Sequence, residues 1–526
     1  MKLYRAFATV GGLTMVSRIL GFVRDILIAA ALGTGFVADA FFVAFRFPNL
    51  FRRLFAEGAF NAAFVPLFAK RLEGNGADAA QAFAEEAMAC LIAVLLVVSA
   101  LAVLAMPWLM LLLAPGFVED PSKYELAVLL TQLAFPYLLC ISVVALLSGV
   151  LNSLGRFTAA AAAPIVLNVV LIGAIGLALW LGYARQPGAG TTLAVGVLIA
   201  GVAQLIVLWT AVHCAGMKVR LRRPRYTEGV RRLVGLGFPG LISGGITQIN
   251  IVVGTIVASL QAGAVSYLYY ADRLYQLPLG IVGAAIGVVL LPDLSRKLRA
   301  GDRAAVMDSQ NRSLELALLL TLPAAVALAV ASEPIIRVLF ERGAFSAQDT
   351  PATAAALAAF AVGLPSFVLI KVFQPAFFAR EDTATPMRFA AVNLAVNAVG
   401  SIVLYFAFKA LGLMPHLGIP AATSAAGWIN AWLLWRVLSR DGDFAADDRL
   451  KRNLPLILLA SVAMGAALAI ATPVLQPYLA VGQSSSVRSA ALGALVALGV
   501  AVFGALSLLT RVVRPDQLGR LLRGAA

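Results

Sequence analysis

Residues 38–60 read ADAFFVAFRFPNLFRRLFAEGAF, a stretch that is apolar enough to cross a membrane and yet carries five charged side chains. Residues 17–25, SRILGFVRD, have the same character. A charged side chain at the centre of a bilayer costs about 2.5–3.5 kcal/mol on insertion scales. The charges in these first two apolar segments therefore need an explanation, and they are Arg18, Arg24, Asp25, Asp39, Arg46, Arg52, Arg53 and Glu57.

The composition predicts an all-α polytopic membrane protein. Of the 526 residues, 61% are hydrophobic and 13% are charged, and the mean hydropathy is +0.91, whereas a soluble domain carries about 25% charged residues. Apolar runs punctuated by Pro and Gly predict 14 transmembrane helices. We expect them at about residues 6–32, 37–68, 85–113, 125–151, 159–183, 191–215, 230–258, 264–292, 312–338, 352–378, 386–410, 418–438, 454–475 and 487–511.

The placement of the basic residues predicts the orientation of the chain. Of 41 Lys and Arg, twenty-eight fall at the termini or in the loops after even-numbered spans. Only six fall on the other side, and they are Lys123, Arg185, Arg337, Arg342, Lys409 and Arg488. Cytoplasmic loops are the ones enriched in Lys and Arg, so we expect both termini in the cytoplasm. The net charge of +15 is then a consequence of topology, and no nucleic acid is expected as a partner.

Neither a metal site nor a cofactor is expected. The three cysteines, Cys90, Cys140 and Cys214, form no CxxC motif and lie in apolar runs, where cysteine usually acts as a small buried hydrophobe. The two histidines, His213 and His416, have no neighbours at ligand spacing.

The chain repeats itself at an interval of about 226–229 residues. PLFAKRLEGNGADAAQAF, from Pro66, matches PDLSRKLRAGDRAAVMDS, from Pro292, in length and pattern. Because the interval contains six spans, an even number, both copies share one orientation and are related by an axis along the membrane normal. We therefore expect two six-helix lobes related by a parallel pseudo-twofold repeat, residues 1–217 and 218–440, plus two extra C-terminal helices and a tail in residues 441–526. The same spacing relates Pro136 to Pro365 and Asn168 to Asn397.

Seven cations and four acids fall within the predicted spans. The cations are Arg18, Arg24, Arg46, Arg52, Arg53, Arg273 and Lys371, and the acids are Asp25, Asp39, Glu57 and Asp272. Facing lipid, the eleven together would cost roughly 30 kcal/mol, so they must line a wet cavity, pair with one another, or do both. Helical spacing places Asp39, Arg46, Arg53 and Glu57 within about 40° of one another, which favours a common polar face.

Two explanations compete for these charges. The first is internal ion pairing, with Arg53 bonded to Glu57 and with Arg24, Asp25 and Asp39 clamping two helices together. It leaves three cations in excess. The second is a translocation site for an anionic, phosphate-bearing substrate, because the planar fork of arginine binds two phosphate oxygens at once.

The segments that carry these charges resemble the MurJ (MviN) family of bacterial lipid II flippases, within the multidrug/oligosaccharidyl-lipid/polysaccharide exporter superfamily. The resemblance spans the chain and is strongest in SRILGFVRD, DAFFVAFRFPNLFRRLFAEGAFNAAFVP and YYADRLYQLPLGIVGAAIGVVLLPDLS. It implies fourteen helices, alternating access, and movement of lipid II, an undecaprenyl-diphosphate-linked disaccharide-pentapeptide, across the bacterial inner membrane for peptidoglycan synthesis. It further implies that the last two helices flank a groove for the polyprenyl tail, with membrane lipids and the cell-wall synthesis machinery as partners.

The family's important cavity residues fall here on Arg18, Arg24, Asp39, Arg52, Arg53, Glu57 and Arg273. With the charge pattern, this assigns substrate binding to Arg18, Arg24, Arg52, Arg53 and Arg273. It assigns ion pairing or gating within the cavity to Asp25, Asp39, Glu57, Asp272, Arg46 and Lys371.

Three rival classes remain in view. A drug or cation exporter of the MATE type would need acids in excess within the cavity, whereas this chain has cations in excess. A flippase for another polyprenyl-diphosphate-linked oligosaccharide has the same charge requirement, so only the family motifs favour lipid II. An enzyme is not expected, because the sequence contains no HExxH motif, no acid cluster with metal spacing and no nucleotide-binding loop.

Overall fold

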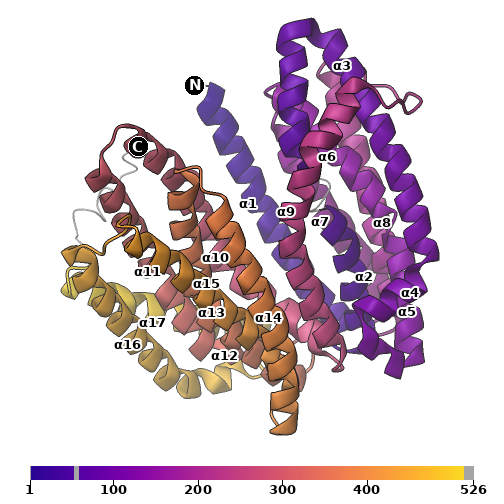
Figure 1. The fold of residues 1–526 in the computed structure, drawn as a ribbon. Helices are drawn as coiled ribbons and strands as arrows, with labels where there is room; N and C mark the ends of the chain where they lie inside the picture. The colour runs from indigo at the N-terminus through magenta and orange to yellow at the C-terminus, as the bar shows by residue number, and fades with distance from the viewer. Residues whose placement is uncertain (1, 53–58, 514–526) are drawn as a thin grey trace. The chain divides into compact units, whose positions relative to one another are not determined.

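The computed structural model describes residues 2–52 and 59–513, and every regular element in these ranges is a helix (Figure 1). The chain forms two compact units. Unit 1 is Met1–Ser266 with Arg342–Phe345, and unit 2 is Tyr267–Glu341 with Ser346–Ala526.

Unit 1 is a bundle of long apolar helices that pack through small residues. Helix α8 packs against α6 and α7, while α1 packs on α7 and α2 on α5. A Cβ at Gly201 of α8 would lie only 2.7 Å from the Tyr137 ring, so glycine allows the close helix approach that is typical of membrane bundles. The elements are α1 (Lys2–Leu32), α2 (Phe36–Arg52), α3 (Ala59–Leu104), α4 (Met106–Leu113), η2 (Pro115–Glu119), α5 (Pro121–Ala134), α6 (Tyr137–Ser153), α7 (Thr158–Trp180), α8 (Pro187–Cys214) and α9 (Glu228–Ser259).

The segment after α8 belongs to unit 1 because it packs along α3. Glu85 of α3 is fully buried; it pairs with Arg222 at 2.5 Å and accepts a bond from the Arg220 amide at 2.9 Å. Helix α9 then lies against α3. The boundary of unit 1 after residue 266 follows from how the helices pack. The boundary expected at 217/218 follows from the sequence repeat, and that division into lobes stays a prediction.

In unit 2, the core lies between α11, α13 and α15. Helix α14 packs on α15, α16 packs on α11, and α17 packs on α16. The elements of unit 2 are α10 (Ala264–Arg299, whose first turn belongs to unit 1), α11 (Arg303–Val330), α12 (Ser332–Phe340), α13 (Asp349–Phe378), α14 (Ala384–Ala410), η3 (Pro415–Leu417), α15 (Gly418–Arg440), α16 (Asp448–Leu479) and α17 (Ser485–Leu509).

Several expected spans are broken or extended. The span expected at 125–151 consists of α5 and α6, which meet at Phe135 and Pro136, and the span expected at 312–338 consists of α11 and α12. Helix α3 covers the end of the second expected span and most of the third, with a kink at Gly76, where φ is 83°. This conformation is not helical, and glycine adopts it without steric penalty, so α3 consists of two helices that meet at Gly76, within the loop expected between the second and third spans.

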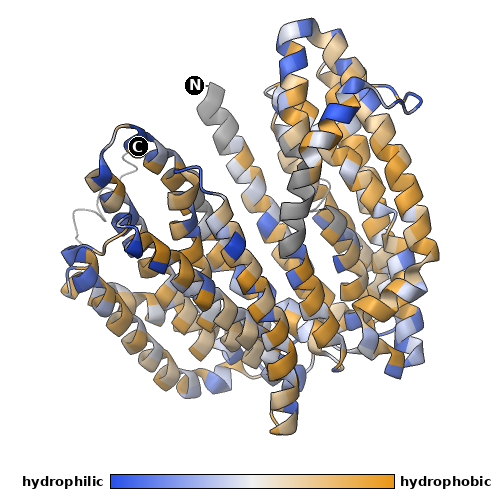
Figure 2. Cartoon of the chain, in the orientation of Figure 1, coloured by the Kyte–Doolittle hydropathy of each residue, from blue (hydrophilic) through white to orange (hydrophobic). Residues whose placement is uncertain are grey.

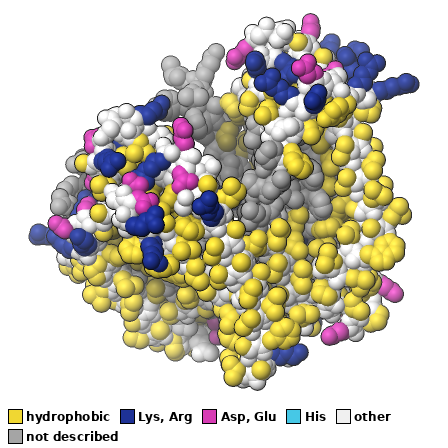
Figure 3. Space-filling model, viewed as in Figure 1, with side chains coloured by type: hydrophobic (Ala, Val, Ile, Leu, Met, Phe, Trp, Pro, Cys, Tyr) yellow, Lys and Arg dark blue, Asp and Glu magenta, His cyan; other side chains and the backbone are white. Residues whose placement is uncertain are grey.

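Among the described residues, nine helical segments are long and apolar enough to cross a membrane. Hydrophobic residues dominate the helices of both units (Figure 2), and on each unit a broad apolar surface gives way to Lys and Arg toward one end (Figure 3). Large side chains such as Trp180 and Leu509 are 82% and 78% exposed on these surfaces. The chain is therefore a multi-pass membrane protein. Helix α2 falls outside the nine because it has 17 residues, and the expected count of 14 stays a prediction.

Candidate functional site

Arg24 lies at the centre of a buried polar cluster in unit 1. It is 6% exposed, and its Nε and Nη2 donate to Asp25 Oδ1 at 3.0 and 2.7 Å. Its Nη1 donates to Asn168 Oδ1 of α7 at 2.9 Å, and its guanidinium carbon lies 5.8 Å from the centre of the Phe45 ring. The expected pairing of Arg24 with Asp25 is therefore present.

Asn168 is a residue of the cluster that the sequence did not assign to the site. The sequence singled it out only as a mark of the repeat. The available signal was its isolation, because it is the only polar side chain between residues 159 and 179. A buried amide needs hydrogen-bond partners, and a lone one in an apolar helix predicts such a partner on a neighbouring helix.

Asp39 forms a second cluster, which is wholly buried. Its Oδ2 pairs with the ammonium of Lys123 at 2.7 Å and accepts from the Gly263 amide at 2.8 Å. Its Oδ1 accepts from the amide and the hydroxyl of Ser266 at 2.9 and 2.8 Å. The carboxylate thus caps the start of α10, where the free amides and the helix dipole favour an anion.

The expected clamp of Arg24, Asp25 and Asp39 is wrong in its third member. In the described chain Asp39 pairs with Lys123, which lies outside the predicted spans and is one of the six cations expected on the periplasmic side. Lys123 comes within reach because α5 packs on α2. Since Asp39 is neutralised by a cation from outside the predicted spans, it compensates none of the seven within them, and their excess over the remaining acids grows from three to four.

Two hairpin tips, one at Gly116 and the other at Gly343 and Ala344, pack against helix ends in unit 1. The Gly116 amide donates to Ser259 Oγ at the end of α9, at 3.1 Å, and the Ala344 amide donates to the Ala30 carbonyl near the end of α1, at 2.7 Å. Arg185 also donates to the Ala344 carbonyl. Residues 116 and 343 are one repeat interval apart, so the predicted repeat would place the two tips at corresponding positions of its two copies.

The other described site residues make contacts of their own. Arg46 of α2 donates to Thr255 Oγ1 of α9 at 3.1 Å. In unit 2, Arg273 donates to the Tyr269 hydroxyl at 2.8 Å with its guanidinium carbon 4.7 Å from the ring centre, and Asp272 accepts from Gln276. Two predicted cations are exposed, Arg18 on α1 and Lys371 on α13.

The remaining three predicted residues are Arg52, Arg53 and Glu57. Arg52 is the last residue of α2. Arg53 and Glu57, with their expected ion pair, lie outside the described residues.

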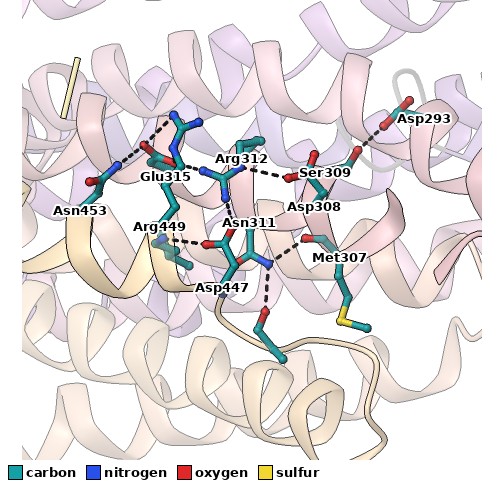
Figure 4. A network of polar contacts seen from close by, with 12 residues as sticks. Asp293, Met307, Asp308, Ser309, Asn311, Arg312, Glu315, Asp447, Arg449 and Asn453 are labelled. Carbon is teal, nitrogen blue, oxygen red and sulfur yellow. Dashed lines mark hydrogen bonds and ion pairs between the residues drawn. The ribbon is translucent and has the colours of Figure 1, made fainter. Parts of the chain in front are cut away.

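Unit 2 contains a larger polar network that the sequence did not predict (Figure 4). Glu315 of α11 is 6% exposed and accepts from Arg312, Arg449 and Asn453. Arg312 also pairs with Asp447, at the start of α16. Because these carboxylates are matched by basic and amide groups, the network fastens α16 to α11.

Together, the apolar helices and the charged clusters buried among them define a multi-pass helical membrane protein with polar sites inside its helix bundle. A family model described as "Lipid II flippase MurJ" matches residues 28–487. The chain therefore belongs to the MurJ family. A "Probable lipid II flippase MurJ" of Rhizobium tropici is 49% identical over 504 residues, which cover 96% of this chain and 93% of that protein. Its counterpart in Vibrio cholerae is 34% identical and covers 98% of this chain and 97% of its own.

Solved structures agree with this assignment. A structure described as "Lipid II flippase MurJ, inward closed conformation" has a TM-score of 0.77 and 25% identity, and the match covers 95% of this chain and 98% of that one. An inward-facing MATE-family transporter of the MOP superfamily has a TM-score of 0.65 at 13% identity, covering 83% of this chain and 98% of its own. The second likeness concerns the fold alone.

Proposed function

We propose that this protein is a lipid II flippase, which moves the undecaprenyl-diphosphate-linked peptidoglycan precursor from the cytoplasmic to the periplasmic leaflet of the bacterial inner membrane. It is a transporter and not an enzyme. Both termini lie in the cytoplasm, and fourteen helices form two lobes and a C-terminal helix pair. Membership of the MurJ family and the 49% identity to a probable lipid II flippase support the substrate.

The observation that carries the mechanism is the excess of cations over acids within the predicted spans, of which Arg24 is buried in the structure. Three of its five N–H groups have acceptors in the described chain, so two remain, which is the number that a bidentate phosphate contact uses. The diphosphate of the substrate binds Arg24 together with Arg18, Arg52, Arg53 and Arg273. Asp25, Glu57, Asp272, Arg46 and Lys371 adjust the charge of the cavity.

The Asp39 cluster acts as the outer latch in an alternating-access cycle. It joins α2 to the start of α10 through three hydrogen bonds and to α5 through the ion pair with Lys123. The link between α1 and α2 also donates to Ser266 from the Gly35 amide. Breaking these contacts opens the periplasmic side. A closed carboxylate cap of this kind is stable without substrate, because its charge is compensated by Lys123.

The C-terminal helix pair provides the path of the polyprenyl tail. Ile470 and Val474 of α16 are 74% and 70% exposed, and Val500 of α17 is 68% exposed, which suits contact with a long hydrocarbon. The polar network at Glu315 and Arg312 keeps α16 attached to α11 while the tail slides past. Membrane lipids share this surface, and the cell-wall synthesis machinery supplies and consumes the substrate.

The test is complementation in a bacterium depleted of its own lipid II flippase, with an assay for the membrane face on which lipid II accumulates. We expect the unchanged chain to restore outward movement. Arg24→Ala and Arg273→Ala should abolish it, and the corresponding lysine variants should restore it only in part, because lysine keeps the charge and loses the fork. Arg440→Ala, at a largely exposed position, serves as the control.

Two results would contradict the proposal in different ways. Full complementation by both arginine-to-alanine variants would leave ion pairing as the role of the buried charges. Failure of the unchanged chain to move lipid II, together with movement of another polyprenyl-diphosphate-linked sugar, would identify the alternative flippase.

A further inference from the structure

Asn168 joins α7 to the substrate-binding face of α1 through two hydrogen bonds. The amide is 4% exposed; its Oδ1 accepts from Arg24 Nη1 at 2.9 Å, and its Nδ2 donates to the Ser17 carbonyl at 2.9 Å. Residues 17, 21 and 24 are spaced four and three apart, so they share one face of α1. A Cβ at Gly21 would lie 3.5 Å from the Asn168 amide, an ordinary van der Waals distance, so the amide packs directly against this face of α1.

The two partners of Arg24 hold different parts of its guanidinium. Asp25 takes Nε and Nη2, while Asn168 takes Nη1. With a carboxylate at one edge and an amide on the far nitrogen, rotation of the planar group would break at least one bond. The two remaining N–H groups therefore keep a fixed direction before any anion arrives, which reduces the entropy lost on binding.

An amide at this place also has the right charge. Arg24 already pairs with the carboxylate of Asp25. A carboxylate at position 168 would accept the same Nη1 bond but would add a negative charge beside Arg24 and repel a diphosphate. Asparagine supplies the acceptor without that charge.

We propose that Asn168 is a positioning residue that holds the Arg24 fork in the orientation in which it receives the substrate diphosphate. The inference rests on the proposed function. It adds a determinant of anion affinity on α7, a helix to which the charge pattern of the sequence assigned no role.

The experiment measures binding and stability separately in the purified full chain. Geranyl diphosphate is the probe, geraniol is its phosphate-free control, and thermal unfolding without ligand reports stability. Asn168→Asp keeps the acceptor for Arg24 and adds charge but loses the donor to the Ser17 carbonyl, whereas Asn168→Leu removes both hydrogen bonds. The matched control is Gln204→Leu, because Gln204 is a buried amide, 2% exposed, that donates to the Ala163 carbonyl and contacts no arginine in the described chain.

We expect Asn168→Asp to lose less stability than Asn168→Leu, because it retains the contact with Arg24, while its affinity for geranyl diphosphate falls by about tenfold or more. Asn168→Leu should lose affinity to a similar degree, and Gln204→Leu should lose stability with its affinity unchanged. Purely structural action of Asn168 predicts instead that affinity follows stability in all three variants, and that outcome would overturn the inference. So would unchanged affinity in both Asn168 variants. Equal binding of geranyl diphosphate and geraniol by the unchanged chain would instead contradict the proposed function itself.

Discussion

Asp39 and Lys123 form a buried ion pair whose two members depend on each other. Lys123 is 6% exposed, Asp39 is fully buried, and the ammonium also lies 4.3 Å from the centre of the Phe117 ring. Removing one member of a buried pair leaves the other charge uncompensated, which destabilises a protein by about 3–5 kcal/mol. We therefore expect Asp39→Asn to lower the unfolding temperature strongly.

The double variant tests whether the loss comes from the pair. Lys123→Met removes the charge that Asp39→Asn strands, so Asp39→Asn with Lys123→Met should be more stable than the sum of the two single losses predicts. Thermal unfolding of the four proteins in detergent measures this coupling. Additive losses would show that the two side chains do not stabilise each other.

His416 makes stability depend on pH. It lies in η3, between two predicted spans, is fully buried and has its Nε2 3.1 Å from the Ala352 carbonyl oxygen. Desolvation by burial lowers its pKa from the ordinary 6.5, and the bond to Ala352 opposes this only in part. Since the unfolded chain then takes up the proton more readily than the folded one, stability is complete above about pH 6.5 and falls as the pH drops toward the folded pKa.

We expect the unfolding temperature of the unchanged chain to decrease between about pH 7 and pH 5.5, where histidine titrates in unfolded chains. His416→Gln should be less stable at neutral pH and should lose most of this slope, because glutamine does not titrate. An unchanged slope in the variant would assign the pH dependence to other groups.

At the scale of elements, the two hairpin tips require glycine. A Cβ at Gly116 would overlap the Ser259 carbonyl, and one at Gly343 would overlap the Ala30 carbonyl; Gly343 also has a φ of +58°. Backbone atoms cannot rotate away as side chains do, so Gly116→Ala and Gly343→Ala should each destabilise unit 1 by about 1–3 kcal/mol. Thermal unfolding checks this, with Gly74→Ala as the control, since nothing lies within 4 Å of a Cβ at that glycine.

The sequence predicted the apolar helices well and their partners poorly. Length and hydropathy are local properties, so long apolar runs such as 191–215 appear as helices close to the expected bounds, here α8 (Pro187–Cys214). The break at Phe135, in contrast, depends on packing between distant segments. Pairing is likewise non-local: Asp25 lies beside Arg24 in the chain and was found, whereas Lys123 reaches Asp39 over 84 residues and was missed.

For the whole molecule, the charge asymmetry predicts the topology. Twenty-eight basic residues are expected on one side and six on the other, which orients the chain by the positive-inside rule. A phosphatase reporter fused after Thr34 or Gly188 should be active, and one fused after Gly74 or Pro224 should be silent. A silent reporter at Gly188 would mean that the predicted span count before it is wrong.

The links at residues 33–36 and 261–263 test alternating access directly. Both are expected on the periplasmic side, at corresponding positions of the repeat, and they lie together in this structure, since the Gly35 amide donates to Ser266 and the Gly263 amide donates to Asp39. A sugar-peptide headgroup can leave the cavity only if they separate.

The sequence alone suggests cysteines at Gly35 and Ala262, but Gly35 has a φ of +88°, which strains any other residue. We therefore place the first cysteine at Thr34 and keep the second at Ala262, in a chain without Cys90, Cys140 and Cys214. A disulfide needs Cα atoms about 4.4–6.8 Å apart, so it should form only while the outer side is closed. Oxidation should then stop lipid II movement and reduction should restore it, because the links are held together in one state and released in the other. A crosslink formed in high yield with undiminished transport would show that the substrate leaves by another route.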